Sequence, residues 1–299
     1  MIVDTHVHLD AVEFSADVDA VMRAARAAGV GRFVVPAVTP ATFDGITRLA
    51  AAHAEIAPAW GLHPLYVEQL EDDALARLRA QIAAQPPVAI GEIGLDAYPG
   101  APDWARQQRI FQAQLALARE LGLPVIVHAR RAVEAVIQML RQERPPGGIV
   151  HAFNGSAQQA RQLLDCNFRL GFGGAMTFAG STRIRRLAAE LPLDAIVLET
   201  DAPDIPPAWA NGTRTEPAWI ARYAQVLADL RGVPLAEIIA RTSENARAAL
   251  PALAQDKALP FDPLVPNETT VAAMRAARAG ELEAVTLEEI RDDIQSAQT

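Results

Sequence analysis

The sequence predicts a (β/α)8 barrel, also called a TIM barrel, followed by a C-terminal extended-plus-helical appendage. Apolar, β-branched runs alternate with amphipathic helical patterns from the N-terminus to about residue 250. Strictly alternating strands and helices imply a parallel sheet, and eight strands in a chain of this length favour a closed barrel over an open, doubly wound sheet. No Gly-x-Gly-x-x-Gly motif follows the first expected strand, which also counts against the open sheet.

The expected strands are short runs rich in apolar and β-branched residues. They cover residues 2–5, 32–36, 56–61, 88–91, 125–128, 149–151, 168–172 and 196–200. Apolar residues recur at helical spacing in residues 16–29, 40–54, 71–84, 104–122, 132–143, 156–165, 181–190, 216–230 and 235–249. We therefore expect residues 1–253 to form the barrel and residues 254–299 to form a separate acidic appendage.

The composition of the sequence limits the classes of protein to which the chain can belong. Half of the 299 residues are hydrophobic, enough for a large core. Neither a run of 18 apolar residues nor a signal-peptide pattern occurs, so we expect a soluble, cytoplasmic protein without membrane contact. The single cysteine, Cys166, excludes an internal disulfide and a cysteine-based metal cluster. The net charge is −9 without a basic stripe, so contact with nucleic acid would depend on local arginines and bound metal.

Histidines and acidic residues lie where the expected strands end. In a barrel these ends converge on one mouth, where functional residues gather. His6 and His8 end the first strand and, two residues apart, point the same way. The fourth, fifth, sixth and eighth strands are followed by Glu92, His128, His151 and Asp201. A His-x-His pair alone is more often structural, but six such residues at the predicted strand ends favour a metal site.

Four imidazoles and two carboxylates are ligands enough for two divalent ions. Glu92 ends an apolar strand between glycines, where a carboxylate is costly to bury unless it is paired or metal-bound. The only lysine is Lys257, so the barrel has no lysine to bridge two metals and Glu92 is the natural bridge. Asp201 could bind one ion and accept a proton from the attacking water. Two metals about 4 Å apart would acidify that water and stabilise an in-line displacement.

Six motifs together resemble the TatD family of metal-dependent hydrolases, within the amidohydrolase superfamily. The resemblance covers about residues 1–250, in the family's order and spacing. The motifs are His-x-His at 6–8, Gly-Leu-His-Pro at 61–64, Gly-Glu-Ile-Gly-Leu-Asp at 91–96, Pro-Val-Ile-Val-His-Ala-Arg at 124–130, His-Ala-Phe-Asn-Gly at 151–155 and Leu-Glu-Thr-Asp-Ala-Pro at 198–203.

The resemblance implies a TIM-barrel phosphodiesterase, of the kind whose members include deoxyribonucleases acting on DNA ends. It implies two divalent ions, Mg, Mn or Zn, and a set of six ligands. These ligands would be His6, His8, Glu92, His128, His151 and Asp201. His63 and Arg130 would face the substrate, where a guanidinium can bind two phosphate oxygens. A small amide, ester or cyclic nucleotide remains the alternative substrate.

One departure from the family's pattern follows the eighth strand. Many relatives have Arg-Asn-x-Pro there, and this chain has Arg-Thr-Glu-Pro at 214–217. A substrate contact by that asparagine would be lost or altered. We expect Thr215 to cap the helix that begins near Glu216, so that the fold survives the change.

The C-terminal segment follows another pattern. Residues 259–267 are proline-rich, and two helical, largely acidic stretches follow them. The simpler interpretation is a solvated appendage packed on the barrel. Alternatively, residues 259–299 resemble the toxin-binding half of RelB/DinJ-type antitoxins, without the DNA-binding half. That resemblance implies an interaction protein that binds a basic toxin partner by folding on it.

Overall fold

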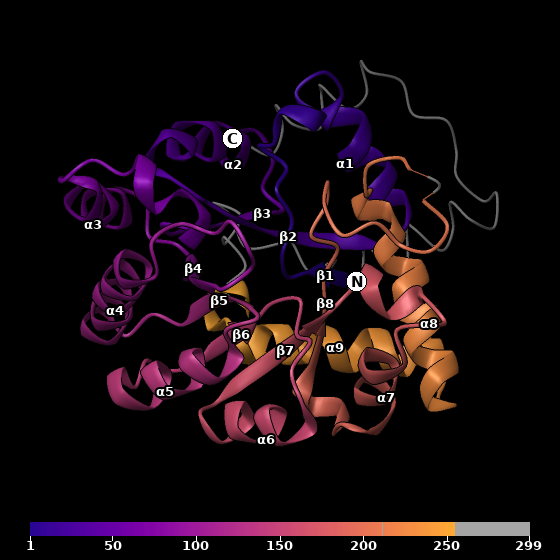
Figure 1. The fold of residues 1–299 in the computed structure, drawn as a ribbon. Coiled ribbons are helices and arrows are strands. Elements are labelled where there is room, and N and C mark those ends of the chain that lie inside the picture. Colours follow the sequence, from indigo (N-terminus) through magenta and orange to yellow (C-terminus); the bar gives the residue numbers. More distant parts are fainter. Residues whose placement is uncertain (211, 255–299) are drawn as a thin grey trace, which may run out of the picture. The chain divides into compact units, whose positions relative to one another are not determined.

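The eight strands form one sheet in chain order, and every neighbouring pair is parallel (Figure 1). The structure is a computed structural model that describes residues 1–210 and 212–254. The strands are β1 Ile2–Asp4, β2 Val30–Pro36, β3 Ile56–Trp60, β4 Ala89–Asp96, β5 Val125–Arg130, β6 Gly148–Val150, β7 Phe168–Phe172 and β8 Ile196–Leu198. The backbone N–H of Thr5 donates to Leu198 O (3.1 Å), and that of Asp201 donates to His6 O (2.8 Å). These bonds join the two ends of the sheet, which confirms the predicted TIM barrel.

Helices surround the strands, as expected from the alternating pattern (Figure 1). They are α1 Val18–Ala27, α2 Phe43–Ala52, α3 Ala74–Ala84, α4 Trp104–Leu121, α5 Val133–Glu143, α6 Ala157–Asp165, α7 Thr182–Glu190, α8 Ile220–Arg231 and α9 Leu235–Ala249. Short 3-10 helices occupy several loops, at η1 Val12–Phe14, η2 Pro40–Thr42, η3 Pro64–Gln69, η4 Gly174–Thr177, η5 Leu193–Ala195, η6 Pro217–Trp219 and η7 Pro251–Ala254. Each predicted helix has an observed counterpart at nearly the same residues.

Local capping explains where some of these helices begin and end. The Ser156 side chain accepts a bond from Gln159 N, and the Gln159 side chain accepts one from Ser156 N, a capping box that starts α6. Asp103 accepts a bond from Arg106 N at the start of α4. Gly122 ends α4 in the left-handed conformation, which costs glycine little.

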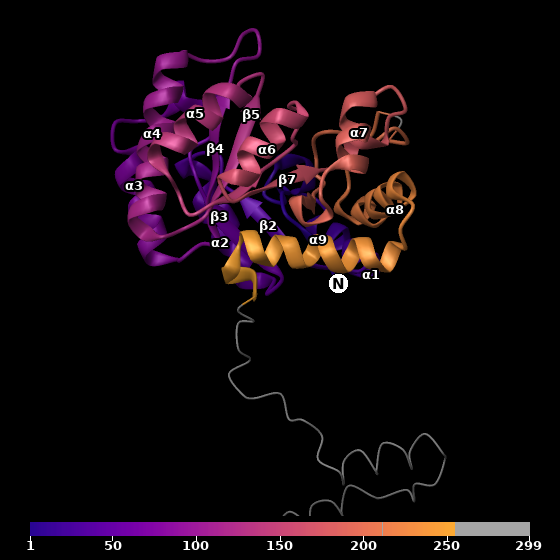
Figure 2. The ribbon, with the colours of Figure 1, turned by 90° about the horizontal axis from the view of Figure 1, so that it is seen from below.

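The end of the barrel at which the strands begin is closed by α9, which lies across it (Figure 2). Buried residues of the strands, among them Val3, Val34 and Ile126, form one apolar cluster with Ala246, Leu250 and Leu253 of α9 and the turn after it. Burying each leucine stabilises the fold by about 2 kcal/mol. This end is filled with apolar side chains, so a site must open at the other end, where the strands finish.

Two sequence predictions about local structure were wrong. The fourth strand was expected to end before Glu92, but β4 continues to Asp96, because it stays paired with β5 as far as Asp96 opposite Arg130. The pairing register shifts between Ile90 and Ile93, so Glu92 lies at an irregularity inside the strand. Thr215 does not cap a helix: its buried Oγ1 has no hydrogen-bond partner, and η6 begins at Pro217.

Met1–Gln255 form one compact unit. Within the part of the chain that the structure describes, no helix is long and apolar enough to cross a bilayer. The predicted domain boundary at residue 253 stays a prediction. The antitoxin-like resemblance falls on residues 259–299, which lie outside the described residues, and no match reported below supports a toxin partner.

Candidate metal centre

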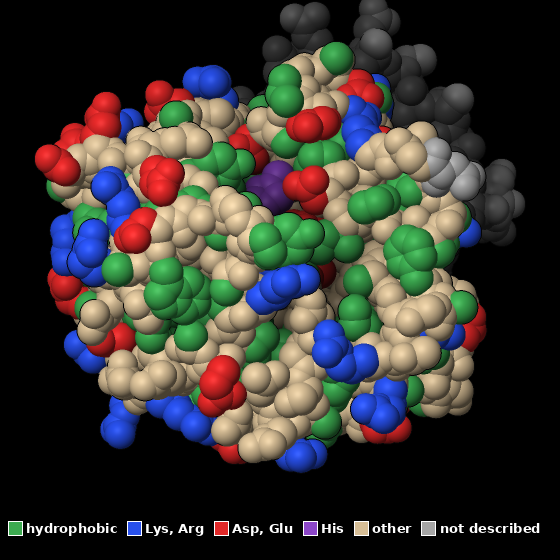
Figure 3. Space-filling model, viewed as in Figure 1, with side chains coloured by type: hydrophobic (Ala, Val, Ile, Leu, Met, Phe, Trp, Pro, Cys, Tyr) green, Lys and Arg blue, Asp and Glu red, His purple; other side chains and the backbone are tan. Residues whose placement is uncertain are grey.

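A cavity of about 890 Å³ opens where the strands finish, and histidines line its floor (Figure 3). Its wall combines residues of β4, β5 and β7 with residues of the segments that follow β1, β2, β3, β6, β7 and β8. Seven of the eight predicted site residues line it, namely His8, His63, Glu92, His128, Arg130, His151 and Asp201. The eighth, His6, is fully buried beneath them. The structure therefore brings the predicted set together at the predicted end of the barrel.

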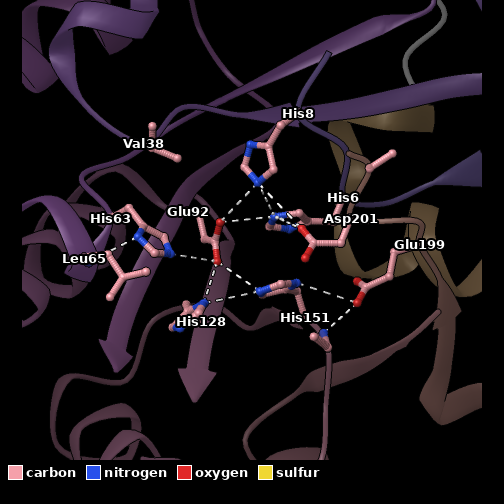
Figure 4. A network of polar contacts seen from close by, with 12 residues as sticks. His6, His8, Val38, His63, Leu65, Glu92, His128, His151, Glu199 and Asp201 are labelled. Carbon is pink, nitrogen blue, oxygen red and sulfur yellow. Dashed lines mark hydrogen bonds and ion pairs between the residues drawn. The ribbon is translucent and has the colours of Figure 1, made fainter. Parts of the chain in front are cut away.

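Glu92 lies at the centre of the cluster, 2% exposed, with its two oxygens facing different imidazoles (Figure 4). Oε2 lies 3.1 Å from His6 Nε2 and 3.7 Å from His8 Nε2. Oε1 lies 3.0 Å from His128 Nδ1 and 3.0 Å from His151 Nε2. One carboxylate thus joins two pairs of nitrogens, an arrangement that suits a group shared by two cations.

Asp201 completes the first of these groups. Its Oδ1 is 3.5 Å from His6 Nε2 and 3.7 Å from His8 Nε2, and the two histidine nitrogens are 3.2 Å apart. A hydrogen bond between Asp201 N and His6 O fixes the loop after β8 against the loop after β1. Three ligand-type atoms therefore converge from the first and last strands of the barrel.

The second group contains His128 and His151, whose Nδ1 and Nε2 atoms lie 3.4 Å apart. His63 also reaches this group: its Nε2 is 3.3 Å from Glu92 Oε1, while its Nδ1 accepts a bond from Leu65 N. The structure thus places His63, predicted to face the substrate, as close to Glu92 as the predicted ligands. Arg130 lies apart from this network, with its guanidinium carbon 3.7 Å from the centre of the Tyr98 ring.

Two carboxylates that the sequence analysis did not assign support these histidines from behind. Asp96 Oδ2 lies 2.9 Å from His128 Nε2, leaving Nδ1 to face Glu92. Glu199 Oε1 accepts the backbone N–H of Ala152 and lies 3.7 Å from His151 Nδ1. Such partners commonly fix the orientation of a metal-binding histidine. Asp96 and Glu199 both lie within the motifs quoted above. Their positions near predicted ligands were the signal in the sequence that could have identified them.

Gly171 makes the room that Glu199 needs. A Cβ at this position would lie 2.1 Å from Glu199 Oε2, so any larger residue would displace the buried carboxylate. Glu199 Oε2 itself is buried without a hydrogen-bond partner. The chain therefore keeps a second buried acid beside the cluster, which adds negative charge to it.

The buried carboxylates and imidazoles of the cluster favour the binding of a cation. Burial would raise the pKa of Glu92, but the surrounding imidazoles, above all His63, His151 and His6, hold this pKa well below its usual value. Burial raises the pKa of Asp201 to about 7. Burial lowers the pKa of His6, whereas Glu92 and Glu199 outweigh burial and raise that of His151. A bound cation would keep the carboxylates ionised and the imidazoles neutral.

The residues present fit divalent cations. The donor set mixes imidazole nitrogen with carboxylate oxygen, which suits Zn²⁺, Mn²⁺ and Fe²⁺. Three groups of side chains each hold three ligand-type atoms within 4.8 Å of one another, and all three draw on the predicted site residues. His6 Nδ1 and His151 Nδ1 are buried without hydrogen-bond partners, whereas the Nε2 atoms of both histidines face Glu92 and the other candidate ligands.

Replacing Glu199 with glutamine should weaken metal binding without unfolding the chain. The amide keeps the size of the side chain and can still accept the bond from Ala152, but it no longer offers a negative charge to His151. We expect the affinity for Mn²⁺ to fall about 10-fold to 100-fold, measured by titration calorimetry. Glu190→Gln, at the exposed end of α7, is the matched control. Equal affinities in the two variants would contradict this role for Glu199.

Comparisons with known proteins agree with this geometry. The family model described as "TatD related DNase" matches residues 3–251. The metal-dependent hydrolase YjjV of Escherichia coli, itself uncharacterized, is 39% identical over 239 residues, which cover 79% of this chain and 92% of that protein. The human protein named deoxyribonuclease TATDN3 is 31% identical over 265 residues, covering 84% and 95% of the two chains.

The fold agrees as closely. The crystal structure of YjjV superposes with a TM-score of 0.81 at 37% identity, over 84% of this chain and 98% of that one. The family match covers all the predicted site residues, and the superposed structure carries the same barrel over nearly its whole length. The chain belongs to the TatD family of metal-dependent hydrolases.

Proposed function

We propose that this hydrolase uses two divalent metal ions to cleave phosphodiester bonds, as a deoxyribonuclease that acts from DNA ends. The observation that carries the proposal is the position of Glu92, whose two carboxylate oxygens each face a separate pair of histidines. A carboxylate shared in this way can hold two ions about 4 Å apart, the separation found in two-metal sites that cleave phosphate esters. The human relative named a deoxyribonuclease supports DNA as the substrate.

In this proposal the six predicted ligands divide into two sets that share Glu92. His6, His8 and Asp201 hold one ion, and His128 with His151 holds the other. When bound, the ions would acidify the attacking water and stabilise charge on the phosphate. Asp201 would take up a proton at the carboxylate oxygen that does not face His6 and His8. Its place in the cavity wall favours such a role in proton transfer.

Arg130 and His63 position the phosphate. Both line the cavity beside the proposed ions, and Arg130 is exposed at the end of β5, with its guanidinium free to present two donors to phosphate oxygens. His63 Nδ1 is occupied by Leu65 N, so Nε2 is the atom that points toward Glu92 and the substrate.

Replacing Arg130 with glutamine should raise KM for a small phosphodiester by about 10-fold or more, with a smaller change in kcat, because a charge-assisted contact to the phosphate is lost. Steady-state kinetics on bis(p-nitrophenyl) phosphate measure this. Arg109→Gln is the matched control, since Arg109 is exposed on α4 and does not line the cavity. If the two variants behaved alike, Arg130 would not be the phosphate contact.

The experiment that tests the function compares substrates. Purified protein is supplied with Mg²⁺, Mn²⁺ or Zn²⁺ and offered single-stranded DNA labelled at one end, a generic phosphodiester, and small ester and amide substrates. Metal-dependent release of terminal nucleotides is the expected result. Cleavage of esters, amides or cyclic nucleotides with no cleavage of DNA would replace the nuclease by the small-molecule alternative.

A further inference from the structure

The cavity mouth carries opposite charges on opposite sides. Beyond the proposed ligands, three acids line the cavity, Asp10, Glu13 and Asp204, and we call them the acidic wall. Glu13 and Asp204 are exposed, and Asp10 is half-buried with one carboxylate oxygen unpartnered. Arg130 is the only lysine or arginine among the residues that line this cavity. Figure 3 shows acidic side chains beside the histidine of the hollow and a basic side chain across from it.

The barrel places these charges across from each other. The acidic wall comes from the loops after β1 and β8, which adjoin where the sheet closes. Arg130 ends β5, four strands from β1 and three from β8 in a sheet of eight, on the far side of the mouth. The separation follows from the order of the strands, so it does not depend on how any one side chain is turned.

No arginine among the described residues pairs with a side chain of the acidic wall. Among residues 1–210 and 212–254, none of the three acids forms an ion pair. The nearby guanidinium of Arg214 is committed elsewhere, because it pairs with Asp17 (2.6 Å) and with Glu216 (2.9 Å) and meets Glu13 only through the backbone carbonyl. The wall therefore presents carboxylates that pair with no arginine to whatever enters the cavity.

The opposite side is built to receive negative charge. The Tyr98 ring contacts two arginines: the guanidinium carbon of Arg130 is 3.7 Å from the ring centre and that of Arg131 is 4.9 Å away. Tyr98 is 43% exposed, and its backbone N–H donates to Asp96, the acid that orients His128. Cation–π contact holds both guanidinium groups against the Tyr98 ring, and of the two arginines Arg130 lines the cavity.

We infer that this asymmetry fixes how a strand enters: the hydroxyl end lies against the acidic wall, and the remaining phosphates leave over Arg130, Tyr98 and Arg131. The inference rests on the proposed function and specifies its substrate. The wall can accept hydrogen bonds from the hydroxyl groups of a terminal sugar, but it repels a further phosphate. A strand cannot pass through the site, so only the terminal bond is cleaved, and a phosphate on the bound end blocks the reaction.

The test uses two oligonucleotides that differ only in a phosphate or a hydroxyl group at the end from which nucleotides are released. For the natural chain we expect kcat/KM to be about 10-fold lower for the phosphate-ended strand, because close like charges at the mouth repel. The variant Glu13→Gln/Asp204→Asn should bring the ratio of the two kcat/KM values close to one. The control variant Asp165→Asn/Glu190→Gln removes the same number of charges at the C-terminal ends of α6 and α7. These two residues do not line the cavity, so this variant should keep the natural ratio.

The ratio can also be obtained without turnover, from the binding of the two strands by fluorescence anisotropy. Equal kcat/KM or equal affinity of the natural chain for the two ends would overturn the inference. A ratio that the wall variant and the control shift equally would also overturn it, since net charge alone would then explain the preference. Absence of DNA cleavage speaks against the proposed function, whereas the binding ratio still decides the inference.

Discussion

The variant Glu92→Gln should lose about 10³-fold or more in kcat while keeping its fold. Glutamine has nearly the same shape, but only its amide oxygen can coordinate a cation. It therefore cannot bridge one ion at each pair of histidines. Loss of one metal removes several kcal/mol of transition-state stabilisation, and each 1.4 kcal/mol is about a factor of ten in rate. Hydrolysis of a generic phosphodiester under saturating metal is the measurement.

The matched control for this variant is Glu190→Gln, which makes the same chemical change at an exposed position at the end of α7. It should retain full activity. Thermal unfolding of both variants in chelator separates loss of the site from loss of the fold. If Glu92→Gln hydrolysed the substrate at the natural rate, the site assigned here would be wrong.

Removing metal should lower the thermal stability of the natural chain substantially as well as abolish its activity. The metal-free cluster keeps buried carboxylates and imidazoles close together, with Asp201 only 8% exposed and His6 fully buried. An ion at 1,000 times its Kd stabilises a folded chain by about 4 kcal/mol. For a domain of this size we therefore expect Tm to rise by about 8 to 16 °C when Zn²⁺ or Mn²⁺ is added back.

Differential scanning calorimetry of chelated and metal-supplied protein provides that comparison. Asp201→Asn serves as the site control and should show a smaller rise, because it removes one ligand charge while leaving the histidines in place. A Tm that did not respond to any divalent ion would contradict the metal centre, whatever the activity.

The sequence alone was sufficient to predict the barrel and to predict that the candidate site residues lie together at one end of it. Strand ends in a parallel barrel converge, so a histidine or acid after each strand could be placed at the mouth without any knowledge of side-chain positions. His6, His8, His151 and Asp201 follow this logic directly, whereas β5 continues two residues beyond His128. Glu92 reached the same mouth by another route, because it lies inside β4 where the pairing with β5 shifts register.

The features of the site that could not be predicted from the sequence depend on contacts between side chains that are distant in sequence. Glu199 and His151 are brought together only by the packing of β8 beside β7, where Gly171 leaves space. The pair Arg130 and Tyr98 joins the ends of two different strands. Thr215 failed as a cap because tertiary structure buries its hydroxyl group, a result that a local capping rule cannot anticipate.

The number of divalent ions bound per chain at saturation is the most direct test of the account. Purified protein is stripped with chelator, titrated with Mn²⁺ or Zn²⁺ by calorimetry, and checked by elemental analysis. The account predicts two ions for the natural chain and fewer for Glu92→Gln, with both natural sites lost or weakened because they share one carboxylate. A natural chain that saturates with a single ion, unchanged by Glu92→Gln, would contradict it.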